Sequence, residues 1–118
     1  MSDALQVVVE TPAFLRDADS LGISEFVRSE IVDFVAANPA IGDEVRGSGG
    51  VRKFRFAGRG KGKSGGYRII SVYLGDDAPV YLLAVLSKGE RANFSAAEIA
   101  AFRSLTVELK RLWRKRRI

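Results

Sequence analysis

Residues 51–87 read VRKFRFAGRGKGKSGGYRIISVYLGDDAPVYLLAVLS and contain three strand-like stretches separated by two connections. Residues 51–57 alternate between aromatic and basic side chains, a period of two that is typical of a strand with one face in the core. Residues 67–74 and the apolar run 80–86 form the next two strands, joined by the turn sequence GDDAP at 75–79. Three successive strands with such connections predict an antiparallel meander.

The flanking sequence predicts one more strand and three helices. A β-branched strand at residues 5–10 is followed by helices that begin after the N-cap residues Thr11 and Ser24. A capping box that starts at Ser95 opens the last helix. The sequence therefore predicts an α+β fold in the order β-α-α-β-β-β-α, with helices packed on a small antiparallel sheet.

Composition sets limits on the class of protein. A chain of 118 residues with 47% hydrophobic residues predicts a single domain, 1–118, whose basic C-terminal tail is 110–118. Cysteine and histidine are absent, which excludes disulfides, thiolate zinc sites and the usual general base. No apolar run is long enough for a membrane helix and no signal peptide is evident, so we expect a cytoplasmic protein without membrane association.

Charge is distributed unevenly along the chain. Residues 1–50 hold three basic and nine acidic groups, a net charge of −6, whereas residues 51–118 hold sixteen basic and five acidic groups, a net charge of +11. Such asymmetry predicts that the second half binds a polyanion. Solvated surface charge is the alternative interpretation.

The connection at 59–68 concentrates this positive charge. It reads RGKGKSGGYR, so four cations alternate with glycines: Arg59, Lys61, Lys63 and Arg68. A nucleotide-binding P-loop is excluded, because the pattern needs a glycine at Ala57 and a helix after the serine. A flexible hairpin loop remains an alternative. However, the basic run extends upstream through Lys53 and Arg55 without an acidic residue, which favours an anion site.

Two further groups of charged residues have competing interpretations. Asp76 and Asp77 could form a carboxylate pair, but aspartate is favoured in turns and we interpret both as turn residues. Lys88 and Arg91 follow the third strand, which in a meander ends at the edge where the second begins. We therefore expect Lys88 to lie near Arg68. The alternative is that Lys88 and Arg91 are solvated residues of a surface loop.

The motifs GKSGGYR at 62–68 and LSKGERANFS at 86–95 resemble the RelE superfamily of bacterial toxins, and most closely its HigB-like branch. The similarity extends from the first strand to the last helix. It implies a RelE-like fold and a metal-independent messenger-RNA endonuclease that acts on the ribosome and inhibits translation. It also implies a partner antitoxin, in the HigB-like case one with a helix-turn-helix.

The resemblance also implies roles for particular residues. Lys61 corresponds to the lysine proposed to activate the ribose 2′-hydroxyl, Arg68 to the arginine that stabilises the scissile phosphate, and Lys88 to a cation near the leaving oxygen. Phe94 stands where RelE has a tyrosine that stacks on a base. The other residues expected to contact RNA are Arg59, Lys63, Arg55, Lys53, Tyr67 and Arg91.

Two other functions stay open at this point. A ParE-like toxin of the same fold would inhibit gyrase and leave RNA intact, and a non-catalytic module would bind nucleic acid without cleaving it. For the antitoxin, we expect contact through the first two helices, around four apolar residues: Phe14, Leu15, Ile23 and Phe26.

Overall fold

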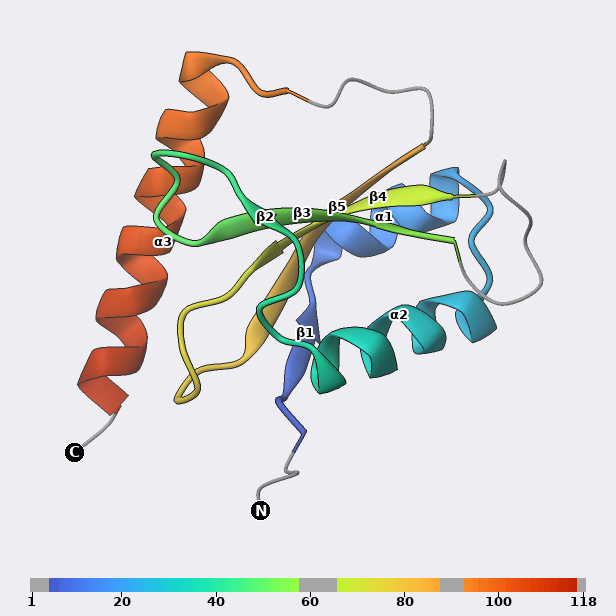
Figure 1. Cartoon of the computed structure of the whole chain (residues 1–118), viewed down its shortest axis with the longest axis horizontal. Helices are drawn as coiled ribbons and strands as arrows, with labels where there is room; N and C mark the ends of the chain where they lie inside the picture. Colours follow the sequence, from blue (N-terminus) through green and yellow to red (C-terminus); the bar gives the residue numbers. More distant parts are fainter. Residues whose placement is uncertain (1–4, 58–65, 88–92, 117–118) are drawn as a thin grey trace.

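The computed structural model of the chain describes residues 5–57, 66–87 and 93–116 (Figure 1). Its elements in order are β1 (Val8–Glu10), α1 (Pro12–Ser20), α2 (Glu25–Ala37), β2 (Asp43–Glu44), β3 (Val51–Phe56), β4 (Tyr67–Val72), β5 (Val80–Ser87) and α3 (Ala96–Arg116). The predicted α+β class and the predicted elements are confirmed. One strand was not expected: β2 lies within the connection between α2 and β3.

The strands form one five-stranded sheet in the order β1-β5-β4-β3-β2. Strands β3, β4 and β5 pair antiparallel, which confirms the predicted meander. The sheet as a whole is mixed, because β1 pairs with β5 in parallel, Val8 opposite Val80. Beyond β1, the edge of β5 is capped by α1, whose Asp17 side chain accepts a hydrogen bond from the backbone N–H of Val85 at 3.2 Å.

Helices α1 and α2 cover one face of the sheet (Figure 1). The hydroxyl of Thr11 accepts a hydrogen bond from the N–H of Phe14, and Ser24 caps α2 in the same way, as the sequence predicts. Between these helices and the sheet lies a core that includes Phe14, Ile31 and Ile69, all fully buried. The hydrophobic effect of burying these side chains holds the helical layer to the sheet.

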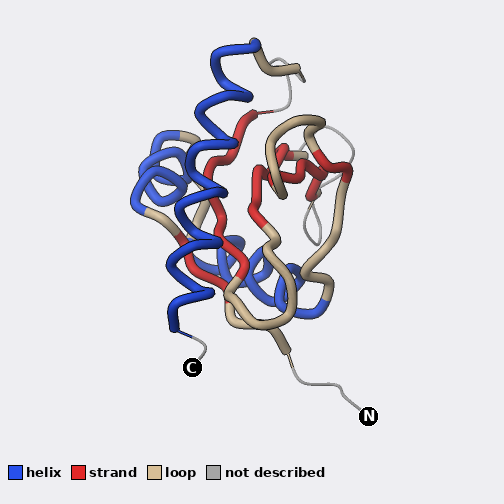
Figure 2. Tube along the Cα trace, turned by 90° about the vertical axis from the view of Figure 1, so that its left-hand side faces the viewer, coloured by secondary structure: helices blue, strands red, loops and turns tan. Residues whose placement is uncertain are grey.

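Helix α3 crosses the opposite face of the sheet (Figure 2). A second core there contains Val51, Ile70 and Val72, which are buried beneath apolar residues of α3. A buried polar contact fixes the helix. Thr106 Oγ1 donates to the Ser48 carbonyl at 2.7 Å, and the Ser48 hydroxyl in turn accepts from the N–H of Val51 at 3.0 Å. This network joins α3, the connection before β3, and β3 itself.

Thr106→Val should test this network. The change keeps the side-chain shape but leaves the buried Ser48 carbonyl without its donor, so we expect the free energy of unfolding to fall by about 1–3 kcal/mol in a urea titration. Ser104→Val is the matched control, because it adds a valine two residues away at an exposed position of α3. The control should change stability by about 0.5 kcal/mol or less. Equal losses in the two variants would show that the hydrogen bond contributes nothing.

Candidate functional site

Strand register brings basic side chains together at one end of the sheet. Arg55 lies opposite Arg68 in the β3–β4 pair, and Arg68 lies opposite Leu86 in the β4–β5 pair. Lys53 lies one row further on, opposite Ile70. These cations share the face that α3 covers. The core beneath α3 includes Ile70 and Val72 of β4, so Arg68 lies beyond it, at the start of the strand.

A hollow of about 290 Å³ lies at this end of the sheet. It is lined by Gly42, Asp43, Lys53, Phe54, Arg55 and Arg68. Arg68 Nε is buried and has no hydrogen-bond partner among the described residues. A buried donor without an acceptor costs roughly 1–3 kcal/mol. Three cations and an unsatisfied guanidinium nitrogen therefore make the hollow suited to an anionic ligand with several acceptor oxygens.

Phe94, just before α3, contacts both a residue of α3 and a cation of the hollow. Its ring meets Phe102 edge-on, with centroids 5.1 Å apart, and Lys53 Nζ lies 6.0 Å from the centre of the Phe94 ring. The side chain is half-buried. Phe94 therefore packs with the core beneath α3 and also helps to position Lys53 by a cation–π contact. Its expected stacking on an RNA base stays a prediction.

Asp43 is a member of the site that sequence reasoning missed. It lies opposite Lys53 in the β2–β3 pair, and Gly42 before it has φ +97°. A Cβ at Gly42 would approach the Lys53 carbonyl oxygen to 2.4 Å, so only glycine fits there. Arg52 donates to the Gly42 carbonyl at 2.8 Å and holds β2 in place. Gly42 was the one sequence feature that could have indicated a close approach of the backbone to a strand here, but sequence alone does not show which strand it approaches.

Tyr67 lies on the opposite face of the sheet from Arg68, because successive residues of a strand alternate between faces. It is half-buried and packs against the core beneath α1 and α2. The expectation that Tyr67 contacts the same ligand as Arg68 therefore does not fit the register. We leave Tyr67 out of the site.

Five of the expected site residues lie outside the described part of the chain: Arg59, Lys61, Lys63, Lys88 and Arg91. The flanking strands are described, however. Ser87, the last residue of β5, pairs with Tyr67, the first residue of β4. The chain therefore enters β4 and leaves β5 at the same end of the strands, which is the end where Arg68 lies. The expected convergence of Lys88 with Arg68 stays a prediction.

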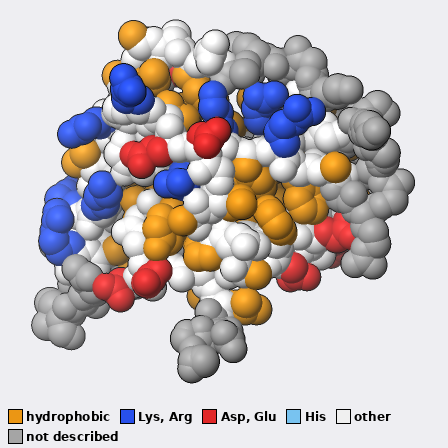
Figure 3. Space-filling view, in the orientation of Figure 1, with side chains coloured by type: hydrophobic (Ala, Val, Ile, Leu, Met, Phe, Trp, Pro, Cys, Tyr) orange, Lys and Arg blue, Asp and Glu red, His pale blue; other side chains and the backbone are white. Residues whose placement is uncertain are grey.

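Basic side chains gather over α3 and over the strands of the sheet (Figure 3). Exposed basic residues on α3 include Arg103, Lys110 and Arg114. Most acidic residues of the first half of the chain belong instead to α1 and α2. Among the described residues, no group of three or more histidine, cysteine or acidic side chains could hold a metal ion. No helix in the same residues is long and apolar enough to span a membrane.

The family model of the RelE toxin of the RelE/RelB toxin–antitoxin system matches residues 13–116. The chain belongs to the RelE toxin family. Among solved structures, it is similar to an arginine-to-alanine double mutant of the E. coli toxin RelE in the free state. That similarity has a TM-score of 0.53 at 16% sequence identity and covers 87% of this chain and 98% of the other. It supports the RelE fold assigned from the family match.

Membership of the RelE family implies an antitoxin partner. Two of the four residues expected to contact it are core residues: Phe14 is fully buried and Ile23 is 7% exposed. Leu15 and Phe26 are exposed, by 39% and 68%. An antitoxin bound to the first two helices would therefore contact Leu15 and Phe26 and would leave Phe14 and Ile23 in the core.

Inorganic phosphate provides a test of the hollow that needs no RNA. Phosphate should raise the melting temperature of the wild-type protein, because it supplies acceptors for Arg68, and a concentration ten times the dissociation constant adds about 1.4 kcal/mol of stability. Arg68→Gln should remove most of this shift in a thermal-denaturation series. Arg16→Gln removes an exposed charge on α1 and should leave the shift intact. Equal shifts in the two variants would contradict an anion site at Arg68.

Proposed function

We propose that the chain is a ribosome-dependent messenger-RNA endonuclease that inhibits translation and is neutralised by a cognate antitoxin. The observation that carries the proposal is the hollow in which Lys53, Arg55 and Arg68 meet, with Arg68 Nε buried and unpartnered among the described residues. The family match supports the same conclusion. A cytoplasmic location, action without a metal ion, and a HigB-like antitoxin with a helix-turn-helix belong to the same proposal.

The proposed reaction is attack by a ribose 2′-oxygen on the adjacent phosphorus. The O2′–P bond forms, the P–O5′ bond breaks, and the products carry a 2′,3′-cyclic phosphate and a 5′-hydroxyl. RNA supplies the nucleophile, so no catalytic serine or cysteine is required. Arg68, with Arg55 and Lys53 beside it, stabilises the charge that develops on the phosphorane oxygens. Arg59, Lys63 and Arg91 supply further phosphate contacts, and Lys88 protonates the leaving 5′-oxygen.

Two groups could accept the proton of the 2′-hydroxyl. Lys61 has this role by family resemblance, but a lysine is neutral in only about one molecule in a few thousand at pH 7. Asp43 lines the hollow with the cations, and its carboxylate oxygens can accept a proton there. Asp43 is therefore an alternative base, and Lys61 then serves to position and neutralise the phosphate.

Arg68→Ala should abolish RNA cleavage and growth arrest while the domain still folds. The reason is that Arg68 contributes a charge in the hollow but lies outside the buried part of β4. Loss of one preorganised charge contact lowers the rate by about 10²–10³-fold. Cleavage should be followed on translating ribosomes by mapping new RNA 5′ ends, with circular dichroism to verify folding. A folded Arg68→Ala protein with wild-type toxicity would refute the site assignment.

Single-turnover cleavage by two variants should identify the base. If Asp43 accepts the proton, Asp43→Asn lowers the rate by about 10²–10⁴-fold because an amide cannot replace the carboxylate as a base, whereas Lys61→Arg retains substantial activity because its charge is kept. If Lys61 is the base, Lys61→Arg is inactive and its charge does not rescue it. Asp33→Asn, which changes an exposed carboxylate of α2, is the control and should leave the rate unchanged.

A ParE-like gyrase inhibitor remains the second candidate, because it would share the fold. Inhibition of gyrase would not require a set of cations that converges on a phosphodiester. The same ribosome experiment separates the functions, since a gyrase inhibitor creates no new RNA 5′ ends. A non-catalytic RNA-binding module would bind the ribosome and also create none.

A further inference from the structure

A second hollow lies beneath the turn between β4 and β5, at the opposite end of the sheet from Arg68. Its volume is about 230 Å³. Leu74, at its rim, lies two residues beyond the end of β4, and a rise of about 3.3 Å per residue separates it from Arg68 by about 20 Å. The hollow is also lined by Gly75, Asp76, Asp77, Ala78, Lys110, Trp113 and Arg114. No step of the proposed cleavage reaction uses any of these residues.

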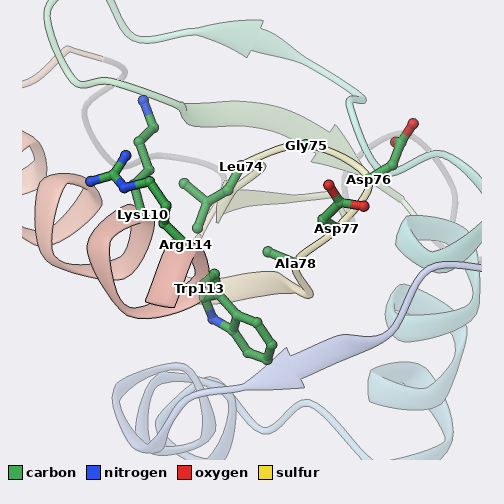
Figure 4. Close-up of a pocket in the computed structure, with 8 residues that line it drawn as sticks. All are labelled: Leu74, Gly75, Asp76, Asp77, Ala78, Lys110, Trp113 and Arg114. Atoms are coloured by element: carbon green, nitrogen blue, oxygen red, sulfur yellow. The ribbon is translucent and has the colours of Figure 1, made fainter. Parts of the chain in front are cut away.

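The walls of this second hollow carry opposite charge. Lys110 and Arg114 come from α3, one helical turn apart, and Asp76 and Asp77 come from the facing turn (Figure 4). Neither Lys110 nor Arg114 forms an ion pair within the described residues, whereas their neighbour Arg111 pairs with Glu108. The basic wall therefore has two exposed cations available for an anionic group.

The acidic wall is held in place by its surroundings. Asp76 Oδ1 accepts a hydrogen bond from the Tyr73 hydroxyl at 2.8 Å, and this bond raises the pKa of Tyr73 above its ordinary value. The side-chain amide of Gln6 donates to the carbonyls of Gly75 and Ala78, at 3.1 and 2.5 Å. The turn is thereby tied to the segment just before β1. A wall fixed in this way can present acceptors with little loss of entropy on binding.

Trp113, also from α3, forms the side of the second hollow that is nearest to β1 (Figure 4). Its indole N–H donates to the hydroxyl of Tyr81 on β5 at 2.7 Å, which fixes the orientation of the half-buried ring. The ring extends from α3 towards β1 (Figure 4). There it also lines an adjoining hollow of about 300 Å³, with Leu5 and Val7 on the other side. The indole is therefore a rigid aromatic surface with open space beside it.

We propose that this second hollow binds an unpaired RNA nucleotide, as a contact separate from the cleavage site. The base stacks on Trp113, a phosphate binds Lys110 and Arg114, and the aspartates accept hydrogen bonds from N–H groups of the base. Stacking on aromatic side chains combined with nearby cations is the common way to hold single-stranded RNA. The proposal rests on the proposed function in one respect, that RNA is the toxin's target.

The charge pattern favours RNA over an acidic peptide. An acidic peptide would be attracted by Lys110 and Arg114 but repelled by the two aspartates on the facing wall. A nucleotide satisfies both walls, because its phosphate is anionic and its base edge carries donors. Aspartate recognises the amino group of cytosine in particular. We therefore expect cytosine-containing RNA to bind more tightly than uracil-containing RNA.

Trp113 is the single tryptophan of the chain, so its fluorescence reports directly on this hollow. The titrant is a short 2′-O-methyl RNA, which has no free 2′-hydroxyl and is not cleaved by the proposed reaction. Binding should quench the fluorescence with saturation, and oligo-C should bind more tightly than oligo-U. The double variant Lys110→Gln/Arg114→Gln should weaken binding at least about tenfold and reduce the salt slope by about 1.4.

Two variants serve as controls. Arg111→Gln removes a charge of the same helix that is already paired with Glu108, and it should leave the quench nearly unchanged. Arg68→Ala should abolish cleavage but keep the quench, which separates this site from the cleavage site. The reverse result, cleavage by the wild type without any quench, would overturn this inference and leave the proposed function intact.

Three further results would also overturn it. Equal weakening by Arg111→Gln and by the double variant would show non-specific charge attraction. Loss of the quench in Arg68→Ala would show that RNA reaches tryptophan only through the cleavage site. Quenching by an arginine-rich peptide but not by RNA would identify the hollow as a protein-binding site.

Discussion

Burial of β4 on both of its faces organises the whole fold. Ile69, Ile70, Ser71 and Val72 are all buried, because α1 and α2 cover one face and α3 covers the other. The first two residues, Tyr67 and Arg68, are only half-buried. The first two residues of β4 therefore extend beyond the part of the sheet that the helices cover, and the cations lie there. If the helices also covered Arg68, its charge would be buried without a counter-charge, at a large cost in free energy.

The cations at the start of β4 lower the stability of the fold. Like charges directly opposite one another on a sheet are destabilising, and Arg55 and Arg68 form such a pair. The buried, unpartnered Nε of Arg68 adds to the cost. The fold tolerates both because the double core around β4 is extensive. Unfavourable electrostatics that are concentrated in one place and supported by the structure around them are typical of a ligand site.

Local sequence signals predicted most of the fold. The caps at Thr11 and Ser24, the capping box at Ser95 and the alternation of 51–56 act over a few residues, and the structure confirms each. What local signals cannot supply is which distant segments meet. Strand β2 has two residues and no apolar pattern of its own, and its position depends on Gly42 reaching β3. Asp43 was missed for the same reason.

The composition of the candidate site depends on which residues share a face of the sheet. Period-two alternation separated Lys53 and Arg55 from Phe54 correctly. The same rule puts Tyr67 and Arg68 on opposite faces, but proximity in sequence grouped them together. The sequence does not single out Trp113, because a lone aromatic on an amphipathic helix is normally a core residue. Only the structure shows that its ring also borders open space next to exposed cations.

The sheet divides the molecule electrostatically as well as structurally. The acidic first half supplies the α1–α2 layer, and the basic residues lie on α3 and at the Arg68 end of the sheet. A separation of charge on this scale orients a protein as it approaches a polyanion and raises the rate of association. Arg68 and Trp113 belong to opposite ends of the α3-covered side, so both would face RNA in the orientation that the field favours. The acidic layer would face away, which leaves Leu15 and Phe26 accessible to a protein partner.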